Sequence, residues 1–429
     1  GERGVRNAEV RGSNPLASTT HRPDRTNDSA DALPDDALVD TPDGVEAVAE
    51  AIRAAGAFTL DLEFVPENRY VPELGLVQVG WDGGSGTEAL EVAAIDPLVV
   101  DPAPVLTLVG DPEIETVTHA AQGDLVILAH RFSVRARALR DTQIAAAFLG
   151  YGDQIGYAPL VESTLGVQLE KGSQYTEWLR RPLTDQQLVY ALDDVRYLAT
   201  IWARQRAALD ADGRLQAVLE ECDRLAETAA SRPPPEEAYR RVKGWSGLRS
   251  RPLGALRQLA AWREREALRA NRPPSRVLND RSLLELARAA PGSDDGLRSV
   301  RGVDAGLVRR HGAALIRAIR EGRDDPPERD RARKPLPPQG EVWAAALHGL
   351  VRARALGANV APRFVGPRSD IEAVVRWWLE GDRDTPPDLP LLSGWRGDLV
   401  GNAIVAWLRG DAALVVDPDS PGGIELRPR

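Results

Sequence analysis

The sequence has little cysteine and no methionine: Cys222 is the only thiol among 429 residues. A single cysteine excludes an internal disulfide and a zinc site built from several thiolates. No apolar run approaches the roughly 18 residues that a membrane-spanning helix needs, and the first residues lack the basic-then-apolar layout of a signal peptide. We therefore expect a soluble, cytoplasmic protein of a reducing compartment that does not associate with membranes.

Acidic residues outnumber basic ones, 64 to 54, and the resulting net charge of −10 argues at first against a nucleic-acid-binding protein. The charge is unevenly distributed, however. Residues 45–225 hold 14 Lys+Arg against 28 Asp+Glu, whereas residues 245–325 hold 17 Arg against 10 Asp+Glu. The acidic part suits bound cations and the basic part suits a polyanion. The alternative is a basic surface that is only solvated.

The length predicts two or three domains, and polar or proline-rich segments predict where they divide. We expect a disordered N-terminal tail, a first domain, two further modules joined by a proline-rich linker, and a loose C-terminal tail. In order, these are residues 1–38, 39–232, 243–323 and 339–416 with the linker 324–338 between them, and 417–429.

The first domain mixes strand and helix signals. Strict alternation of apolar residues over 58–64 predicts a strand with one buried face. Shorter apolar segments predict further strands over 76–79, 89–95 and 116–118. A helix is expected from about Gln122, and a long helix after Thr184, which forms a capping box with Gln187. This mixture predicts an α/β domain.

The two C-terminal modules are helical by periodicity and they repeat. Asn271 and Pro274 recur as Asn359 and Pro362 at an offset of 88 residues. The matching segments are short but occupy equivalent places, which favours a duplicated helical module over coincidence.

Two acidic residues on the first strand are the strongest chemical signal. Asp61 and Glu63 are two residues apart, so both carboxylates lie on the face opposite the apolar side chains. Adjacent carboxylates repel each other unless a hard divalent cation such as Mg²⁺ or Mn²⁺ neutralises them. The pair alone is equally compatible with the polar outer face of an edge strand.

Three more residues extend this pattern. Tyr190 and Asp194 are four apart on the long helix and share one of its faces, whereas Asp193 points about 100° away. Asp124 stands near the start of a helix, where an acid often only interacts with the helix dipole. Each signal is weak by itself.

Taken together, Asp-x-Glu on a first strand, Asp at a strand–helix junction and Tyr-x-x-x-Asp on a late helix resemble the tyrosine subclass of the DEDD exonuclease superfamily. The surrounding segments resemble the ribonuclease D family, in order, from about residue 40 to 415. They are LDLEFV at 60–65, YVPELGLVQ at 70–78, IDPL at 95–98, HAAQGDL at 119–125, DTQ at 141–143, WLRRPL at 178–183 and LLSGWRGDL at 391–399.

This resemblance implies an RNase H-like (DnaQ-like) α/β exonuclease domain followed by two all-α HRDC domains. It further implies a 3′→5′ exoribonuclease that uses two divalent metal ions, Mg²⁺ or Mn²⁺, and acts on RNA 3′ ends, typically those of tRNA precursors. Separately, we expect the protein to be a monomer. The implied metal ligands are Asp61, Glu63, Asp124 and Asp194, with Tyr190 orienting the attacking water.

Several other polar residues are candidates for RNA contact. They are His119, Lys171, Gln174, Arg181, Arg265, Arg269 and Arg272. Arginine binds phosphate well, but solvated loops and exposed helices explain the basic residues as simply, and His119 also fits a structural role at a strand end. We expect Asp141 to cap a helix, Asp96 to form a turn, and Trp178 to lie in the core.

Two other functions stay open from the sequence. A DNA 3′→5′ exonuclease of the same superfamily would carry the same carboxylates, because sugar preference depends on 2′-hydroxyl contacts that the sequence does not locate. A catalytically silent RNA-binding scaffold would be expected to have lost at least one of them. All four acids and the tyrosine are present, which favours the enzyme.

Overall fold

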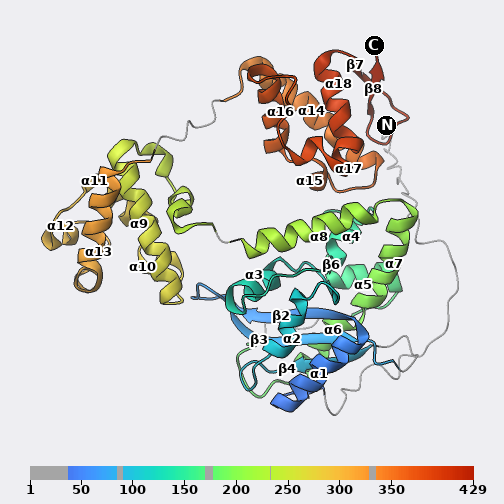
Figure 1. Ribbon diagram of the computed structural model, residues 1–429, viewed down its shortest axis with the longest axis horizontal. Coiled ribbons are helices and arrows are strands. Elements are labelled where there is room, and N and C mark those ends of the chain that lie inside the picture. The colour runs from blue at the N-terminus through green and yellow to red at the C-terminus, as the bar shows by residue number, and fades with distance from the viewer. Residues whose placement is uncertain (1–36, 85–89, 170–176, 232, 328–334) are drawn as a thin grey trace, which may run out of the picture.

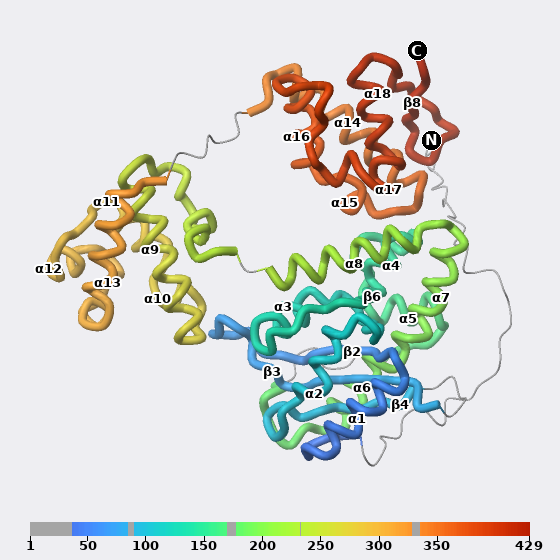
Figure 2. The backbone as a smooth tube through the Cα atoms, viewed as in Figure 1, coloured from blue at the N-terminus to red at the C-terminus, as the bar shows by residue number. Residues whose placement is uncertain are grey.

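The computed structural model describes residues 37–84, 90–169, 177–231, 233–327 and 335–429. Figure 1 shows a sheet covered by helices, a first helical module in yellow and orange, and a second helical module in red. Figure 2 traces the same path and shows the second module beside α8. Among the described residues, no helix is long and apolar enough to cross a membrane.

Six strands form one sheet in the order β1-β4-β3-β2-β5-β6. They are β1 (Leu38–Val39), β2 (Ala57–Val65), β3 (Glu73–Trp81), β4 (Glu91–Ile95), β5 (Glu115–Thr118) and β6 (Leu139–Asp141). β2 pairs antiparallel with β3 and parallel with β5, so it lies inside the sheet. The alternative of an edge strand for the Asp-x-Glu pair is therefore wrong.

The N-terminal boundary needs a correction. The expected tail 1–38 includes Leu38, but Leu38 belongs to β1, and the Ala37 carbonyl accepts a hydrogen bond from the Ala94 N–H. Pairing with β4 orders this part of the chain because it satisfies backbone groups that would otherwise need water. Residues 1–36 lie outside the described residues, as does the first residue of the strand expected over 89–95.

Eight helices of this α/β domain are described. They are α1 (Pro42–Ala55), α2 (Ala103–Leu106), α3 (Gln122–Arg131), α4 (Thr142–Ala147), α5 (Tyr157–Leu165), α6 (Asp185–Arg196), α7 (Leu198–Ala211) and α8 (Leu215–Ala230). The capping box of Thr184 and Gln187 is confirmed at the start of α6. The single long helix is wrong: the chain breaks at Tyr197, because α6 packs on β2, β3 and β4 whereas α7 packs on α4 and β5.

The first helical module has its own apolar core, separate from that of the α/β domain. Its helices are α9 (Ser250–Arg269), α10 (Pro274–Val277), α11 (Asp280–Ala289), α12 (Asp294–Arg298) and α13 (Ala305–Asp324). Two 3₁₀ turns, Pro235–Arg241 and Trp245–Gly247, precede it. The helical prediction for this part of the chain is confirmed.

The second helical module begins by repeating the first. Its helices are α14 (Pro338–Gly357), α15 (Pro362–Val365), α16 (Arg368–Glu380), α17 (Gly394–Arg396) and α18 (Asn402–Arg409). The starts of α14, α15 and α16 each follow those of α9, α10 and α11 by 88 residues. Asn271 and Asn359, which follow the first helix of each module, both have positive φ, 44° and 52°. The two modules therefore repeat each other in backbone conformation as well as in sequence.

The C-terminal tail is a second correction. Residues 417–429 were expected to be loose, but β8 (Ile424–Pro428) pairs antiparallel with β7 (Ala412–Val416). The hairpin packs on the second module: β8 lies against α14, and Leu414 and Leu426 join the apolar cluster. Burial of these side chains stabilises the pairing, because an isolated two-stranded hairpin is only marginally stable.

The second module is firmly docked on the α/β domain. Its buried side chains and those of the α/β domain form one continuous apolar cluster, in which Phe148 contacts Phe364 and Trp395. Within this junction Arg396 and Glu221 form an ion pair of 2.7 Å, with side chains 7% and 5% exposed. Removing one partner of such a pair leaves the other charge buried without compensation.

Arg396→Ala is therefore expected to lower the free energy of unfolding by about 3 kcal/mol or more, since the buried Glu221 carboxylate then keeps only its longer contact with Arg224, at 3.8 Å. The matched control is Arg180→Ala, which removes an ion pair with Glu177 whose side chains are about 80% exposed; it should cost less than about 1 kcal/mol. Urea denaturation measures both. Equal, small effects would show that water solvates the Arg396–Glu221 pair in solution.

Candidate active site

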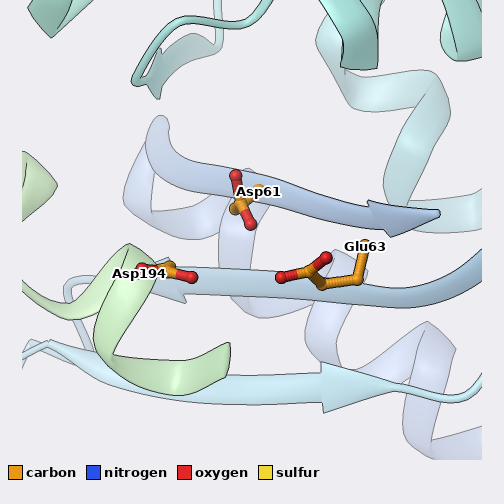
Figure 3. A group of neighbouring side chains, drawn as sticks. All are labelled: Asp61, Glu63 and Asp194. Atoms are coloured by element: carbon orange, nitrogen blue, oxygen red, sulfur yellow. The ribbon is translucent and has the colours of Figure 1, made fainter. Parts of the chain in front are cut away.

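Three carboxylates from two elements converge on one point of the α/β domain. One oxygen each of Asp61, Glu63 and Asp194 lie within 4.8 Å of one another. Figure 3 shows Glu63 and Asp194 pointing toward each other, with Asp61 beside them. β2 supplies the first two through its period-two geometry, and α6, which lies on this sheet, supplies the third.

Asp124 adjoins this group without being within the same 4.8 Å. It is buried in the first turn of α3, and the charges of Asp61 and Glu63 help to raise its pKa. The preceding residue lets α3 approach β2 closely, because a side chain at Gly123 would collide with the Phe64 ring. The sequence thus predicted four acids, of which the structure gathers three tightly and places the fourth alongside.

All four carboxylates hold their protons more strongly than usual. Burial raises the pKa of Asp61 to about 6, and burial together with the Asp61 charge raises that of Glu63 to about 8. Burial, then the charges of Asp61 and Glu63, raise the pKa of Asp194 to about 9. Burial is also the main reason that the pKa of Asp124 is raised. Such a donor set fits a hard divalent cation, which would replace lost hydration and offset the repulsion.

Tyr190 lies one turn before Asp194 on α6, as the spacing predicted. Its half-buried hydroxyl hydrogen-bonds the Asp194 carboxylate, and burial followed by the Asp194 charge raises its pKa. Trp178, buried as expected, lies 6.2 Å from the Tyr190 ring between centroids. The phenol is therefore held beside the carboxylates with its proton in place.

Arg181, a candidate for RNA contact, is engaged within the protein. Its guanidinium donates to both carboxylate oxygens of Asp96, one at 2.6 Å, and to the carbonyl oxygens of Gly75 and Trp178 at 2.8 Å each. This clamp fixes the segment that carries Trp178 against β3 and β4. Asp96 also forms the expected turn, accepting from the Leu98 N–H, but sequence reasoning missed its ion pair, because no local pattern links residues 85 positions apart.

His119 is likewise enclosed by the protein. Its Nδ1 lies 2.9 Å from the Thr142 hydroxyl and its Nε2 lies 3.1 Å from the Ile155 carbonyl oxygen. Burial lowers its pKa. The structural role considered for His119 fits these contacts.

Asp141 does more than the expected helix cap. As the N-cap of α4 its carboxylate accepts from the N–H groups of Gln143 and Ile144. The same carboxylate accepts from the N–H groups of Ala120 and Ala121, at the start of α3. It therefore fixes the turn from which α3 carries Asp124 into the site.

Tyr157 is a site residue that sequence reasoning missed. Its buried hydroxyl donates to the Asp193 carbonyl at 2.8 Å, and its ring packs against His119. Asp193 itself pairs with Arg196 at 3.0 Å, away from the carboxylate cluster. The only sequence signal was an aromatic residue at the start of a short helix, which is far too common to predict a contact with α6.

The remaining candidates for RNA contact lie either outside the described residues or on the first helical module. Lys171 and Gln174 lie outside the described residues. Arg265 pairs with Glu236 at 3.2 Å and Arg269 with Glu266 at 2.6 Å, both on the first helical module. Arg272 is exposed just after α9.

Comparisons with known proteins agree with this site. A family model described as a 3′-5′ exonuclease matches residues 37–209, and one described as an HRDC domain matches residues 253–319. The protein is thus a 3′–5′ exonuclease that carries an HRDC domain.

Its relatives define the family more closely. The chain is 37% identical to ribonuclease D of Gluconacetobacter diazotrophicus, over 90% of this chain and 96% of that one. It is 33% identical to ribonuclease D of Escherichia coli, over 86% and 96%. The crystal structure of Escherichia coli RNase D, an exoribonuclease involved in structured RNA processing, superposes with a TM-score of 0.73 at 32% identity, over 87% of this chain and 98% of that one. The chain belongs to the ribonuclease D family of exoribonucleases.

The raised pKa values predict how the metal-free protein responds to pH. Asp61, Glu63 and Asp194 keep their protons to about pH 6, 8 and 9 when folded, whereas in the unfolded chain they lose them near pH 4. Their contribution to stability is complete below pH 4 and is lost as the pH rises toward 9. In EDTA at pH 8, Asp194→Asn should therefore unfold with a free energy about 1–3 kcal/mol higher than the wild type.

Chemical denaturation at pH 5 and pH 8, with EDTA and with Mn²⁺, measures this difference. Asp193→Asn is the matched control on the same helix; it removes the ion pair with Arg196 and should be neutral or slightly destabilising. Mn²⁺ should reverse the order and favour the wild type. A lower stability of Asp194→Asn in EDTA would show that burial and neighbouring charge do not destabilise the ionised Asp194 carboxylate.

Proposed function

We propose that the protein hydrolyses RNA from its 3′ end, releasing nucleoside 5′-monophosphates, with two divalent metal ions held by Asp61, Glu63, Asp124 and Asp194. The observation that carries this proposal is the convergence of three carboxylates from β2 and α6 within 4.8 Å, with Asp124 adjoining them, in a chain of this family. Mg²⁺ and Mn²⁺ are the ions expected, since both prefer carboxylate oxygen.

Bound cations would activate the attacking water and stabilise the charge on the departing 3′-oxygen. The protein itself holds the four acids in place and limits their contact with water. The strand β2 and the helices α3 and α6 supply them. The Asp141 cap and the Arg181–Asp96 clamp support this arrangement from behind. We therefore assign His119 and Arg181 to positioning rather than to RNA contact.

Tyr190 acts in this proposal as a neutral phenol. Its raised pKa keeps the proton on its oxygen at neutral pH. The hydroxyl hydrogen is donated to Asp194, so the oxygen lone pairs remain available to accept a hydrogen bond from the water. Tyr190 would then aim the water along the line of attack, and the proton that the water loses would go elsewhere.

RNA is proposed over DNA because the chain belongs to the ribonuclease D family and its HRDC domain is basic. Precursor tRNAs with 3′ extensions are the proposed substrates, in keeping with a relative involved in structured RNA processing. The proposed protein acts as a monomer, since one chain supplies the three carboxylates that converge, and a cytoplasmic location is proposed from the sequence alone. Arg265, Arg269 and Arg272, with Lys171 and Gln174, remain proposed RNA contacts.

A second HRDC domain is proposed for the second helical module. The support is the repeat itself: three consecutive helices start at a constant offset of 88 residues, and the asparagine after the first helix keeps its positive φ. We propose the boundaries 39–232 for the exonuclease domain and 243–323 and 339–416 for the two HRDC domains, with the linker 324–338 between them.

Digestion of a 5′-labelled tRNA precursor with a 3′ extension tests the proposed activity. With Mg²⁺ or Mn²⁺ the wild type should give a ladder that shortens from the 3′ end. EDTA should abolish it, and Asp61→Ala should reduce the rate by at least about 1,000-fold, because the ligands act as a unit. A DNA strand of the same sequence should be cut more slowly. RNA binding without cleavage under every metal would instead support the silent scaffold.

Tyr190→Phe tests the role of the phenol. Loss of the hydroxyl should lower kcat by about 100-fold, because the attacking water is no longer held in line with the phosphate, while KM for RNA changes little. Tyr151→Phe is the control, since the Tyr151 hydroxyl has no hydrogen-bond partner among the described residues. A rise in KM with an unchanged kcat would show that Tyr190 binds substrate instead of orienting water.

A further inference from the structure

A cavity of about 340 Å³ lies outside the carboxylate site, where the α/β domain meets the first helical module. Its walls come from the β2–β3 loop (residues 66–72), the C-terminal end of α3 and the C-terminal part of α9. Figure 1 shows this loop reaching the first module beside α10. Residues of both domains therefore line the cavity, which exists only while the two domains are in contact.

Specific hydrogen bonds hold the two walls together. The Asn271 side-chain oxygen accepts from two successive N–H groups of the loop, those of Tyr70 at 3.1 Å and Val71 at 2.9 Å. The Tyr70 hydroxyl donates to Glu264 of α9. Arg276 of α10 donates to the Asn68 side-chain oxygen at 2.9 Å. Contacts of this kind fix the register of the loop against the module, so the cavity has a defined shape.

The lining of the cavity combines positive charge with an apolar surface. Arg69, His130 and Arg131 line it, against the single carboxylate of Glu73, which pairs with Arg69. Arg131 is exposed and forms no ion pair within the described part of the chain. Its guanidinium is thus available to a phosphate, which arginine can bind through two parallel hydrogen bonds.

Apolar side chains complete the cavity. Val71 and Pro72 line it from the loop, and Leu268 lines it from α9 with 42% of its surface exposed. An exposed leucine on an otherwise basic module is a surface on which a ribose or base could pack. Phosphate-binding and apolar groups side by side suit a nucleotide strand better than a free anion.

Two elements connect this cavity to the carboxylate site. α3 carries Asp124 in its first turn and Arg131 at its end, seven residues later, which places both on one face about 10 Å apart along the axis. β2 carries Glu63, and the loop that follows it carries Arg69. A stacked strand rises about 3.4 Å per nucleotide, so about three nucleotides span this distance.

We propose that the cavity binds the phosphodiester backbone of the RNA strand a few nucleotides upstream of the 3′ end, with Arg131 as its principal phosphate contact. This inference rests on the proposed function, because it assumes that the 3′ end occupies the carboxylate site. The first HRDC domain then completes a subsite by positioning the β2–β3 loop, in addition to any contact that its own arginines make.

Arg131→Gln in the full chain tests the subsite, with Arg135→Gln as the control. Arg135 is also exposed, follows α3 closely and lies outside the cavity lining, so it matches the change in net charge. Binding of a 5′-fluorescent oligo(A) RNA of about 12 nucleotides is measured in EDTA over a series of salt concentrations. Arg131→Gln should weaken binding several-fold and reduce the slope of log K against log salt by about 1, and Arg135→Gln should leave the slope unchanged.

Hydrolysis with Mn²⁺ provides the second measurement. Arg131→Gln should raise KM for the longer RNA and leave the hydrolysis of a dinucleotide, which is too short to reach the cavity, as in the wild type. An unchanged salt slope and KM would overturn the proposal, and so would an equal loss on the dinucleotide. If the salt slopes of the wild type and Arg131→Gln differ as expected but the wild type cleaves no RNA, the proposed function fails while the RNA-binding subsite stands.

Discussion

The partial burial and mutual repulsion of clustered carboxylates are the constraint on which the structure of this protein depends. Asp61, Glu63 and Asp194 lie within 4.8 Å of one another with raised pKa values, and Asp124 adjoins them. A fold selected only for stability would not gather these groups, since each unit of pKa shift costs about 1.4 kcal/mol. The rest of the domain holds them there: β2 lies inside the sheet, α6 packs across it, and Asp141 and Arg181 fix the segments behind.

The two helical modules contribute to this arrangement in different ways. The second shares a continuous core with the α/β domain and adds the buried Arg396–Glu221 pair, so it belongs to the rigid body that carries the site. The first has a separate core and meets the α/β domain through polar contacts to one loop. Both modules nevertheless meet the α/β domain just after their first long helix: Asn271 contacts the β2–β3 loop, and Ala361, two residues after Asn359, donates its N–H to the Ala147 carbonyl of α4.

Local patterns predicted much of this from the sequence. Alternation placed Asp61 and Glu63 on one face of a strand, and helical spacing placed Tyr190 beside Asp194, because both periodicities are fixed by backbone geometry. The α6 capping box was also evident from two residues three positions apart, and the repeated modules from short motifs that recur 88 residues later. The likeness to the ribonuclease D family linked these fragments into one site.

Contacts between distant segments could not be predicted in this way. The Arg181–Asp96 clamp, the Tyr157 contact with α6 and the docking of both modules join residues that only the folded chain brings together. Burial also reassigned residues whose sequence pattern was ambiguous: Leu38 and the C-terminal segment entered strands, and the long helix divided at Tyr197 to follow two surfaces. Propensity alone does not determine such outcomes, because packing decides them.

Crystallographic location of Mn²⁺ by its anomalous scattering would show whether these carboxylates hold metal ions. We expect two peaks in the α/β domain, coordinated by oxygen atoms of Asp61, Glu63, Asp124 and Asp194 at about 2.0–2.3 Å. Crystals of Asp194→Asn should lose at least one of the peaks. Absence of Mn²⁺ from these carboxylates in the wild type, at concentrations that support RNA hydrolysis, would contradict metal-ion catalysis at this site.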